Sequence, residues 1–281
     1  MTEIHDKKPP KPVLQPSKSV PIGLYLSQES VPSDLFCEYS KDITLQYYEN
    51  ESPIDLKFLS KQSEFTFKHR AILIDWIHST HKRFKLQAET LFLSINILDR
   101  YCTCRSIRIS QLQLLGLTVL FLSAKYEEIY APELNSLLKS IDCVFLKEQV
   151  ATLEKDILFA LDYSITKPTS LKFFIRNAEL IGTRGNIYSF GLYLLELAFD
   201  HKIVAYKPSV IASAAVVLAH LLFHKDTPCR LKKKLAVDGD LKKCMQEILI
   251  VLEFARENPL RSIWDKYSKR RYHCVSSLTL L

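Results

Sequence analysis

The sequence predicts an all-α protein in which an N-terminal helix precedes two tandem five-helix bundles. Apolar residues recur at helical spacing through most of the 281-residue chain. The chain contains only 6 glycines, which disfavours β-rich folds with many tight turns. The segments LFLSINILD at 91–99 and LYLLELAFD at 192–200 share one apolar pattern, so the second half is expected to repeat the plan of the first.

The part before the bundles is predicted to contribute little to the core. Residues 1–33 hold six of the 12 prolines, and this composition predicts a disordered tail. Residues 34–66 are predicted to form an N-terminal helix and a connector. The helix is indicated by Phe36, Tyr39, Ile43 and Tyr47, which form an apolar stripe at helical spacing.

The N-terminal bundle is predicted over residues 67–165. Thr66 is placed to cap its first helix. Its third helix is apolar almost throughout from Leu114 to Ala124, so other helices must surround it. The five predicted helices span 67–84, 87–102, 110–127, 132–139 and 146–161, and Pro132 is expected in the first turn of the fourth.

The C-terminal bundle is predicted over residues 166–278. Pro168 interrupts the chain before it, because proline cannot continue a helix. Its third helix is rich in small apolar residues and matches the place of the apolar helix in the first bundle. The five predicted helices span 170–180, 187–199, 208–223, 241–256 and 260–267.

Nothing in the sequence indicates a catalytic centre, a metal site or a bound cofactor. Neither GxGxxG nor GxxxxGK is present, so nucleotide binding has no support. His220 and His224 stand at i and i+4, but the glutamate of a metalloprotease and a third ligand are missing. The seven cysteines lack a CxxC pair and indicate reduced thiols in a cytosolic or nuclear protein. The chain is therefore interpreted as a binding module.

The net charge of +7 is explained most simply by lysine-rich solvated helix faces. A surface for nucleic acid or for an acidic partner stays open as an alternative. No signal peptide is visible, and the longest apolar run, at 210–223, is too short to span a bilayer.

Several segments strongly resemble the cyclin box of the A- and B-type mitotic cyclins. In order, they are HRAILIDW (69–76), ETLFLSINILDRY (89–101), LQLLG (112–116), SAKYEEIYAPE (123–133), KEQVATLEKDIL (147–158) and YSKRRYHCVSSL (267–278). The resemblance covers residues 34–278 and implies two tandem five-helix cyclin boxes. It also implies a function: a non-catalytic subunit that activates a cyclin-dependent kinase at the G2-to-M transition, in the nucleus and cytoplasm.

The resemblance implies a kinase-binding surface around Lys125 and Glu154. In the family, both residues grip the mobile regulatory helix of the kinase. The N-terminal helix is implied to turn Ile43 toward the kinase. The family often has phenylalanine where two tyrosines stand here, so each hydroxyl needs water or a polar partner. The implied apolar bed of this surface consists of Leu122, Tyr126, Leu158, Tyr163 and Ile165.

A second implied surface is a substrate-docking groove for Arg-x-Leu segments. This chain departs from the family at two positions. His69 stands in place of methionine, and Ser79 stands where an acidic residue meets the arginine of the ligand. We therefore expect the leucine pocket to be kept and the preference for arginine to be reduced, with Asp142 as a candidate to supply part of the charge. The matching groove positions are Ile72, Leu73, Trp76, Leu112 and Gln113.

A buried ion pair is also implied, between Arg70 and Asp99. In cyclins the equivalent arginine turns inward and joins the first helix of the box to the end of the second. Removing one partner of such a pair typically costs about 3–5 kcal/mol.

The main alternative is a nucleic-acid-binding cyclin-box protein like a general transcription factor. The charge of +7 permits it, but the CxxC pairs of a zinc ribbon are missing. The kinase partner, the cell-cycle stage and the substrates stay open. The assignment to A or B type stays open as well, because ILIDW is common in B types whereas YHCVS is similar to A types. Residues 1–33 contain neither RxxL nor KEN, so either another degradation signal or an incomplete chain is expected.

Overall fold

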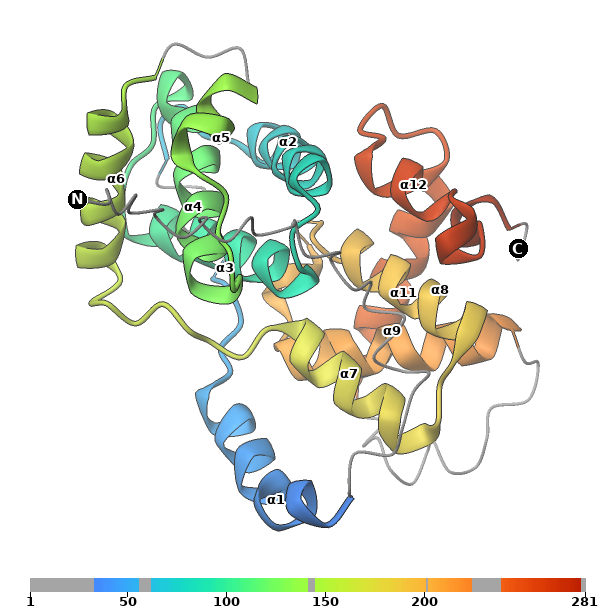
Figure 1. The fold of residues 1–281 in the computed structure, drawn as a ribbon. Helices are drawn as coiled ribbons and strands as arrows, with labels where there is room; N and C mark the ends of the chain where they lie inside the picture. Colours follow the sequence, from blue (N-terminus) through green and yellow to red (C-terminus); the bar gives the residue numbers. More distant parts are fainter. Residues whose placement is uncertain (1–32, 56–61, 141–144, 201, 224–238, 279–281) are drawn as a thin grey trace, which may run out of the picture. The chain divides into compact units, whose positions relative to one another are not determined.

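The computed structural model describes residues 33–55, 62–140, 145–200, 202–223 and 239–278 (Figure 1). These residues form helices and contain no β-strand. The chain divides into two compact units, residues 1–44 and 45–281. Helix α1 (Ser33–Asn50) begins in the first unit and ends in the second. Within the second unit, Tyr47 and Tyr48 of α1 pack against Phe173.

The N-terminal bundle consists of five α-helices among the described residues. Helix α4 is the central one and contacts α2, α3 and α6, as predicted from its continuous apolar sequence (Figure 1). A short 3-10 turn, η3 (Ile109–Gln111), leads into it. The helices are α2 (Phe67–Phe84), α3 (Ala88–Cys104), α4 (Leu112–Glu127), α5 (Leu134–Ser140) and α6 (Lys147–Ala160).

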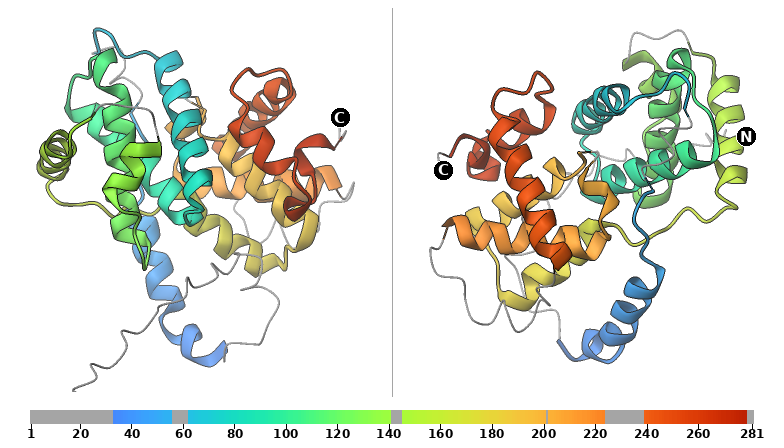
Figure 2. Two further views of the ribbon diagram at one scale, coloured as in Figure 1. Left: turned by 45° about the horizontal axis from the view of Figure 1, so that its top comes forward. Right: turned by 180° about the vertical axis from the view of Figure 1, so that it is seen from behind.

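The C-terminal bundle repeats this plan, which confirms the predicted fold class of two tandem five-helix bundles. Helix α9 takes the central place and contacts α7, α8 and α11 (Figure 2). Its alanines are fully buried, so neighbouring helices approach it closely. The described helices are α7 (Ser170–Ile181), α8 (Gly185–Leu197), α9 (Pro208–Phe223), α11 (Gly239–Ala255) and α12 (Ser262–Tyr267), with 3-10 turns η4 (Ile203–Ala205), η5 (Arg270–Tyr272) and η6 (Val275–Ser277).

Local side-chain chemistry sets several helix ends. Thr66 caps α2 as predicted: its hydroxyl accepts the amide hydrogen of His69, and the His69 ring in turn contacts the Thr66 amide. The prediction for Pro132 is wrong by two residues, because α5 begins at Leu134. Helix α12 begins at Ser262, whose amide donates to Asp75 of α2, so a neighbouring helix supplies its N-terminal acceptor.

Gly116 brings α2 and α4 close together. A Cβ atom at this position would lie 2.7 Å from Cδ1 of Leu73 and 3.2 Å from the ring of Trp76. The absence of a side chain on α4 therefore lets two large residues of α2 pack directly on the helix. Within the described ranges, no helix is long and apolar enough to cross a membrane.

Candidate functional site

Lys125 and Glu154 lie side by side where α4 meets α6. Lys125 stands in the last turn of α4, and its ammonium forms an ion pair with the Glu154 carboxylate of α6. The two side chains are 38% and 17% exposed. The Lys125 Nζ also lies 4.6 Å from the ring centroid of Phe121, a cation–π contact that further restrains it. Both charges are therefore preorganised at the surface.

Two exposed tyrosines lie near this pair in the chain, one on α4 and one in the segment that follows α6. Tyr126 is 52% exposed and Tyr163 is 69% exposed, whereas Leu158 and Ile165 are half-buried. The hydroxyl of Tyr126 accepts a hydrogen bond from Thr166. This is a polar partner of the kind expected from the sequence for a tyrosine at this position. Large exposed apolar side chains of this kind are typical of protein interfaces.

The chain leaves α6 through two residues in the left-handed region, Asp162 (φ 49°) and Tyr163 (φ 53°). The amide of Tyr163 donates to the Leu158 carbonyl at 2.8 Å and closes the helix. The Arg100 guanidinium donates to the Ile165 carbonyl at 3.0 Å. These contacts hold Tyr163 outward at the end of α6.

Two of the predicted contact residues, one on each predicted surface, are buried in this structure. Leu122 and Leu73 are each only 4% exposed and belong to the main hydrophobic cluster. Their side chains lie beneath the two predicted surfaces and expose little area. Ile43 lies on the first unit's part of α1 and is 44% exposed.

The sequence reasoning missed Phe159, which is 71% exposed on α6. The signal was available, because Phe159 falls outside the stripe of Val150, Leu153, Ile157 and Leu161 that faces the core. An aromatic residue off the apolar stripe of an amphipathic helix is a candidate contact residue.

The predicted docking groove is a half-buried strip between α2 and α4. Ile72 is 56% exposed, and Trp76, Leu112 and Gln113 are half-buried. His69, which replaces the family's methionine, is engaged with Thr66 at the helix cap. Ser79 is exposed and carries no charge. Asp142, the candidate for the missing charge, lies outside the described residues.

The structure contains the predicted pair of Arg70 and Asp99, and both side chains are buried. Arg70 Nε donates to Asp99 Oδ1 at 2.6 Å, and Nη2 donates to Oδ2 at 2.7 Å. The remaining Nη1 donates to the carbonyl of Phe199 at 2.6 Å. Because Phe199 lies two residues after the end of α8, Arg70 joins three segments and links the two bundles, a contact that the sequence did not indicate.

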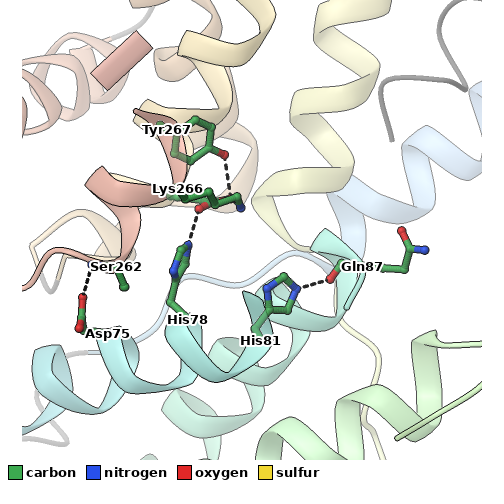
Figure 3. A network of polar contacts seen from close by, with 8 residues as sticks. Asp75, His78, His81, Gln87, Ser262, Lys266 and Tyr267 are labelled. Carbon is green, nitrogen blue, oxygen red and sulfur yellow. Dashed lines mark hydrogen bonds and ion pairs between the residues drawn. The ribbon is translucent and has the colours of Figure 1, made fainter. Parts of the chain in front are cut away.

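A second polar junction joins the bundles at Glu196 of α8, which is 2% exposed. Figure 3 shows His78, Lys266 and Tyr267 of this junction. The Glu196 carboxylate accepts hydrogen bonds from His78 Nε2 of α2 at 2.9 Å and from Tyr267 Oη of α12 at 2.8 Å. It also pairs with the ammonium of Lys266. Burial acts to raise the pKa of Glu196, but Lys266 and His78 outweigh burial and lower it to about 2.

The same junction includes His81, one turn further along α2. Its Nε2 lies 2.7 Å from the Gln87 carbonyl, to which it donates (Figure 3). Burial and the charge of Lys266 lower the pKa of His81 to about 4, so the ring is neutral at pH 7. Within the described residues, no group of three or more His, Cys, Asp or Glu side chains is placed to hold a metal ion.

Comparisons with known proteins match both bundles. The family model "Cyclin, N-terminal domain" matches residues 42–166, and "Cyclin, C-terminal domain" matches residues 168–281. The "G2/mitotic-specific cyclin-B" of Marthasterias glacialis is 34% identical over 253 residues, which cover 88% of this chain and 65% of that protein. The "G2/mitotic-specific cyclin-A" of Patella vulgata is 33% identical over 248 residues, covering 86% and 58% respectively. The chain thus spans less than two thirds of the length of these relatives.

Solved structures share the fold at low sequence identity. A viral cyclin from herpesvirus saimiri gives a TM-score of 0.67 at 19% identity, over 81% of this chain and 100% of that chain. A chain of the yeast RNA Pol II CTD kinase CTDK-1 complex gives 0.55 at 14% identity, over 72% and 75%. Since the two domain models together match nearly all of the sequence after residue 41, this chain belongs to the cyclin family, and its relatives are mitotic cyclins of the A and B types.

Proposed function

We propose that this chain is the activating, non-catalytic subunit of a cyclin-dependent kinase that acts at the G2-to-M transition, in the nucleus and cytoplasm. The observation that carries the proposal is the preformed pair of Lys125 and Glu154. Exposed Tyr126, Phe159 and Tyr163 belong to the same two helices and to the segment that follows α6. The names of the relatives support the proposal, since they are G2/mitotic-specific cyclins. So do two solved neighbours, which come from a CTD kinase complex and a CAK complex.

The geometry suits an allosteric activator. A rigid surface that binds only the active placement of a kinase helix shifts the kinase population toward that placement. Lys125 and Glu154 carry opposite charges at one spot, so they can meet a backbone carbonyl and a backbone or side-chain N–H of the same segment. The apolar side chains around them provide the area, and little ordering is needed on binding.

The test is activation of a purified mitotic cyclin-dependent kinase, measured as histone phosphorylation against the concentration of this chain. We expect the wild-type chain to activate the kinase and the double variant Lys125→Ala/Glu154→Ala to need at least ten times more protein for half-maximal activity. The matched control is Lys155→Ala, which removes an exposed charge next to Glu154 on α6. The proposal fails if the wild-type chain does not activate the kinase, or if the control loses as much as the double variant.

We further propose that the groove of Ile72, Trp76, Leu112 and Gln113 docks substrates or inhibitors through a leucine and with little preference for arginine. The support is the uncharged Ser79 at the position where the family has an acidic residue. Arg-x-Leu and Ala-x-Leu peptides should bind with affinities within threefold of each other, and Ser79→Glu should restore a preference for arginine. A strong arginine preference of the wild-type chain would contradict this.

The alternative of a nucleic-acid-binding cyclin-box protein finds no support among these relatives, which are mitotic cyclins. Steep salt-dependent DNA binding by the purified chain would favour it again.

A further inference from the structure

Helix α2 has a second open face, which points away from the docking groove and toward the C-terminal bundle. Phe67, Ala71 and Asp75 follow each other at i, i+4 and i+8 on this face and line a cleft of about 100 Å³. The opposite walls come from α8, α11 and α12. Helices α2 and α12 are in contact, and Figure 2 shows them as neighbours. The volume far exceeds the roughly 10–15 Å³ that one water molecule requires on this scale.

The cleft combines an apolar wall with an accessible mouth. Trp264, Ile263 and Leu260 stand on one side and are only partly buried. Phe67 on the other side is 38% exposed, and Ala71 is exposed. A bulky apolar side chain of another molecule would bury surface against both bundles at once.

The charged lining of the cleft is acidic. It consists of one cation, Arg70, and three carboxylates, Asp75, Glu196 and Asp200, so the sum of formal charges is −2. Immediately behind the lining, Asp99 pairs with Arg70 and Lys266 pairs with Glu196; these add −1 and +1. The Arg261 guanidinium lies 5.0 Å from the centroid of the Trp264 ring and pairs with Asp265; these add +1 and −1, so the sum is unchanged. The site is therefore complementary to a cation.

A buried hydroxyl also lines this cleft. Tyr193 is fully buried, and its Oη has no hydrogen-bond partner among the described residues. Buried hydroxyls in proteins nearly always have a partner. Tyr193 lines this cleft and a second one beside α11, and a polar group that enters either cleft could supply the partner.

We propose that this cleft binds a peptide segment of a partner protein in which a lysine or arginine stands next to a bulky apolar residue. The apolar side chain packs against Trp264 and Phe67, and the cation lies near Asp75. The docking groove has the uncharged Ser79 where the family has an acidic residue, whereas the other face of the same helix carries Asp75. The inference goes beyond the proposed function, since the binding requires no kinase.

The two tryptophans of the chain make the test direct, because Trp76 lies at the groove and Trp264 lines the cleft. The chain is labelled with 5-fluorotryptophan, and the two ¹⁹F signals are assigned with Trp→Phe variants. The probes are nine-residue peptide pools with a fixed central Lys-Leu, Glu-Leu or Lys-Ser pair and random flanks. We expect the Lys-Leu pool to shift the Trp264 signal and leave Trp76 unchanged. The other two pools should bind at least tenfold more weakly.

A matched pair of variants locates the site independently. Ala71 and Ile72 are adjacent and exposed on different faces of α2, so Ala71→Arg should weaken Lys-Leu binding at least tenfold while Ile72→Arg changes it less than twofold. Asp75→Asn keeps the acceptor for the Ser262 amide and should reduce the preference for Lys-Leu over Glu-Leu. Unchanged melting temperatures show that these variants are folded.

Three outcomes would overturn the proposal. The first is absence of binding by the Lys-Leu pool. The second is a shift of the Trp76 signal with loss of binding in Ile72→Arg, which would place the segment in the groove. The third is equal binding of the Lys-Leu and Lys-Ser pools, which would show attraction by charge alone. Because kinase is absent throughout, none of these outcomes depends on whether the chain activates one.

Discussion

Replacing Glu196 by glutamine tests whether the buried charge between the bundles stabilises the fold. The substitution keeps the size of the side chain and removes its charge. It leaves the Lys266 ammonium, whose side chain is 8% exposed, without a compensating anion, and it weakens the acceptor for His78 and Tyr267. Breaking a buried ion pair in this way costs about 3–5 kcal/mol.

The pKa of Glu196 gives a second measure of the same interaction. Burial opposes ionisation, yet Lys266 and His78 lower the pKa from 4.5 to about 2. At about 1.4 kcal/mol per pKa unit, this fall corresponds to about 3 kcal/mol. Because the pKa is lower in the folded chain, the stabilisation is present above about pH 4.5 and is lost as the pH falls toward 2.

The assay is urea unfolding at pH 7, followed by circular dichroism. We expect Glu196→Gln to lower the free energy of unfolding by about 3–5 kcal/mol. The controls are the single variant Lys266→Met and the double variant Glu196→Gln/Lys266→Met. The double variant should lose less than the sum of the single losses, because no uncompensated charge stays buried. A loss below about 1 kcal/mol for Glu196→Gln, or additive losses in the double variant, would refute the reasoning.

Three further predictions concern other buried positions. Asp99→Ala should cost about 3–5 kcal/mol, because Arg70 stays buried without its partner; a wild-type melting temperature would contradict this. His81→Gln should flatten the dependence of urea midpoints on pH, since the pKa of His81 is lowered to about 4 and wild-type stability is therefore lost as the pH falls from about 6.5 to 4. Parallel pH curves for the two proteins would count against it. Gly116→Ala should destabilise by about 1 kcal/mol through crowding against α2. Gly239→Ala should not, because no atom of the described residues beyond its own helix and chain neighbours lies within 4 Å of the added Cβ.

The sequence predicted the helices whose local pattern is unambiguous. The central helices α4 and α9 are apolar on nearly every side, a pattern that only a buried helix satisfies. The cap at Thr66 was also predictable, because it depends on residues three positions apart. The start of α12 was not, because its acceptor is Asp75, 187 positions earlier in the chain.

The candidate sites show the same division between local and distant contacts. Glu196 falls within the apolar repeat LYLLELAFD at the place of Ile95 in LFLSINILD, and a lone acid inside an apolar helix is a signal for a buried partner. Its partners could not be named, since His78 lies 118 positions and Lys266 70 positions away. The spacing of residues along one helix predicts which of them share a face. It does not predict which face of a second helix will pack against that face.

Helix α2 shows why the junction at Glu196 matters for recognition as well as for stability. The groove around Trp76 is built from α2 and α4, both in the N-terminal bundle. The cleft at Ala71 has walls from both bundles, so its width depends on how the bundles are held together. Apolar packing alone tolerates small sliding motions, whereas hydrogen bonds with fixed directions do not. The contacts of Glu196 with α2 and α12, together with Arg70 and the Phe199 carbonyl, therefore fix the shape of the cleft, while the groove keeps its shape without them.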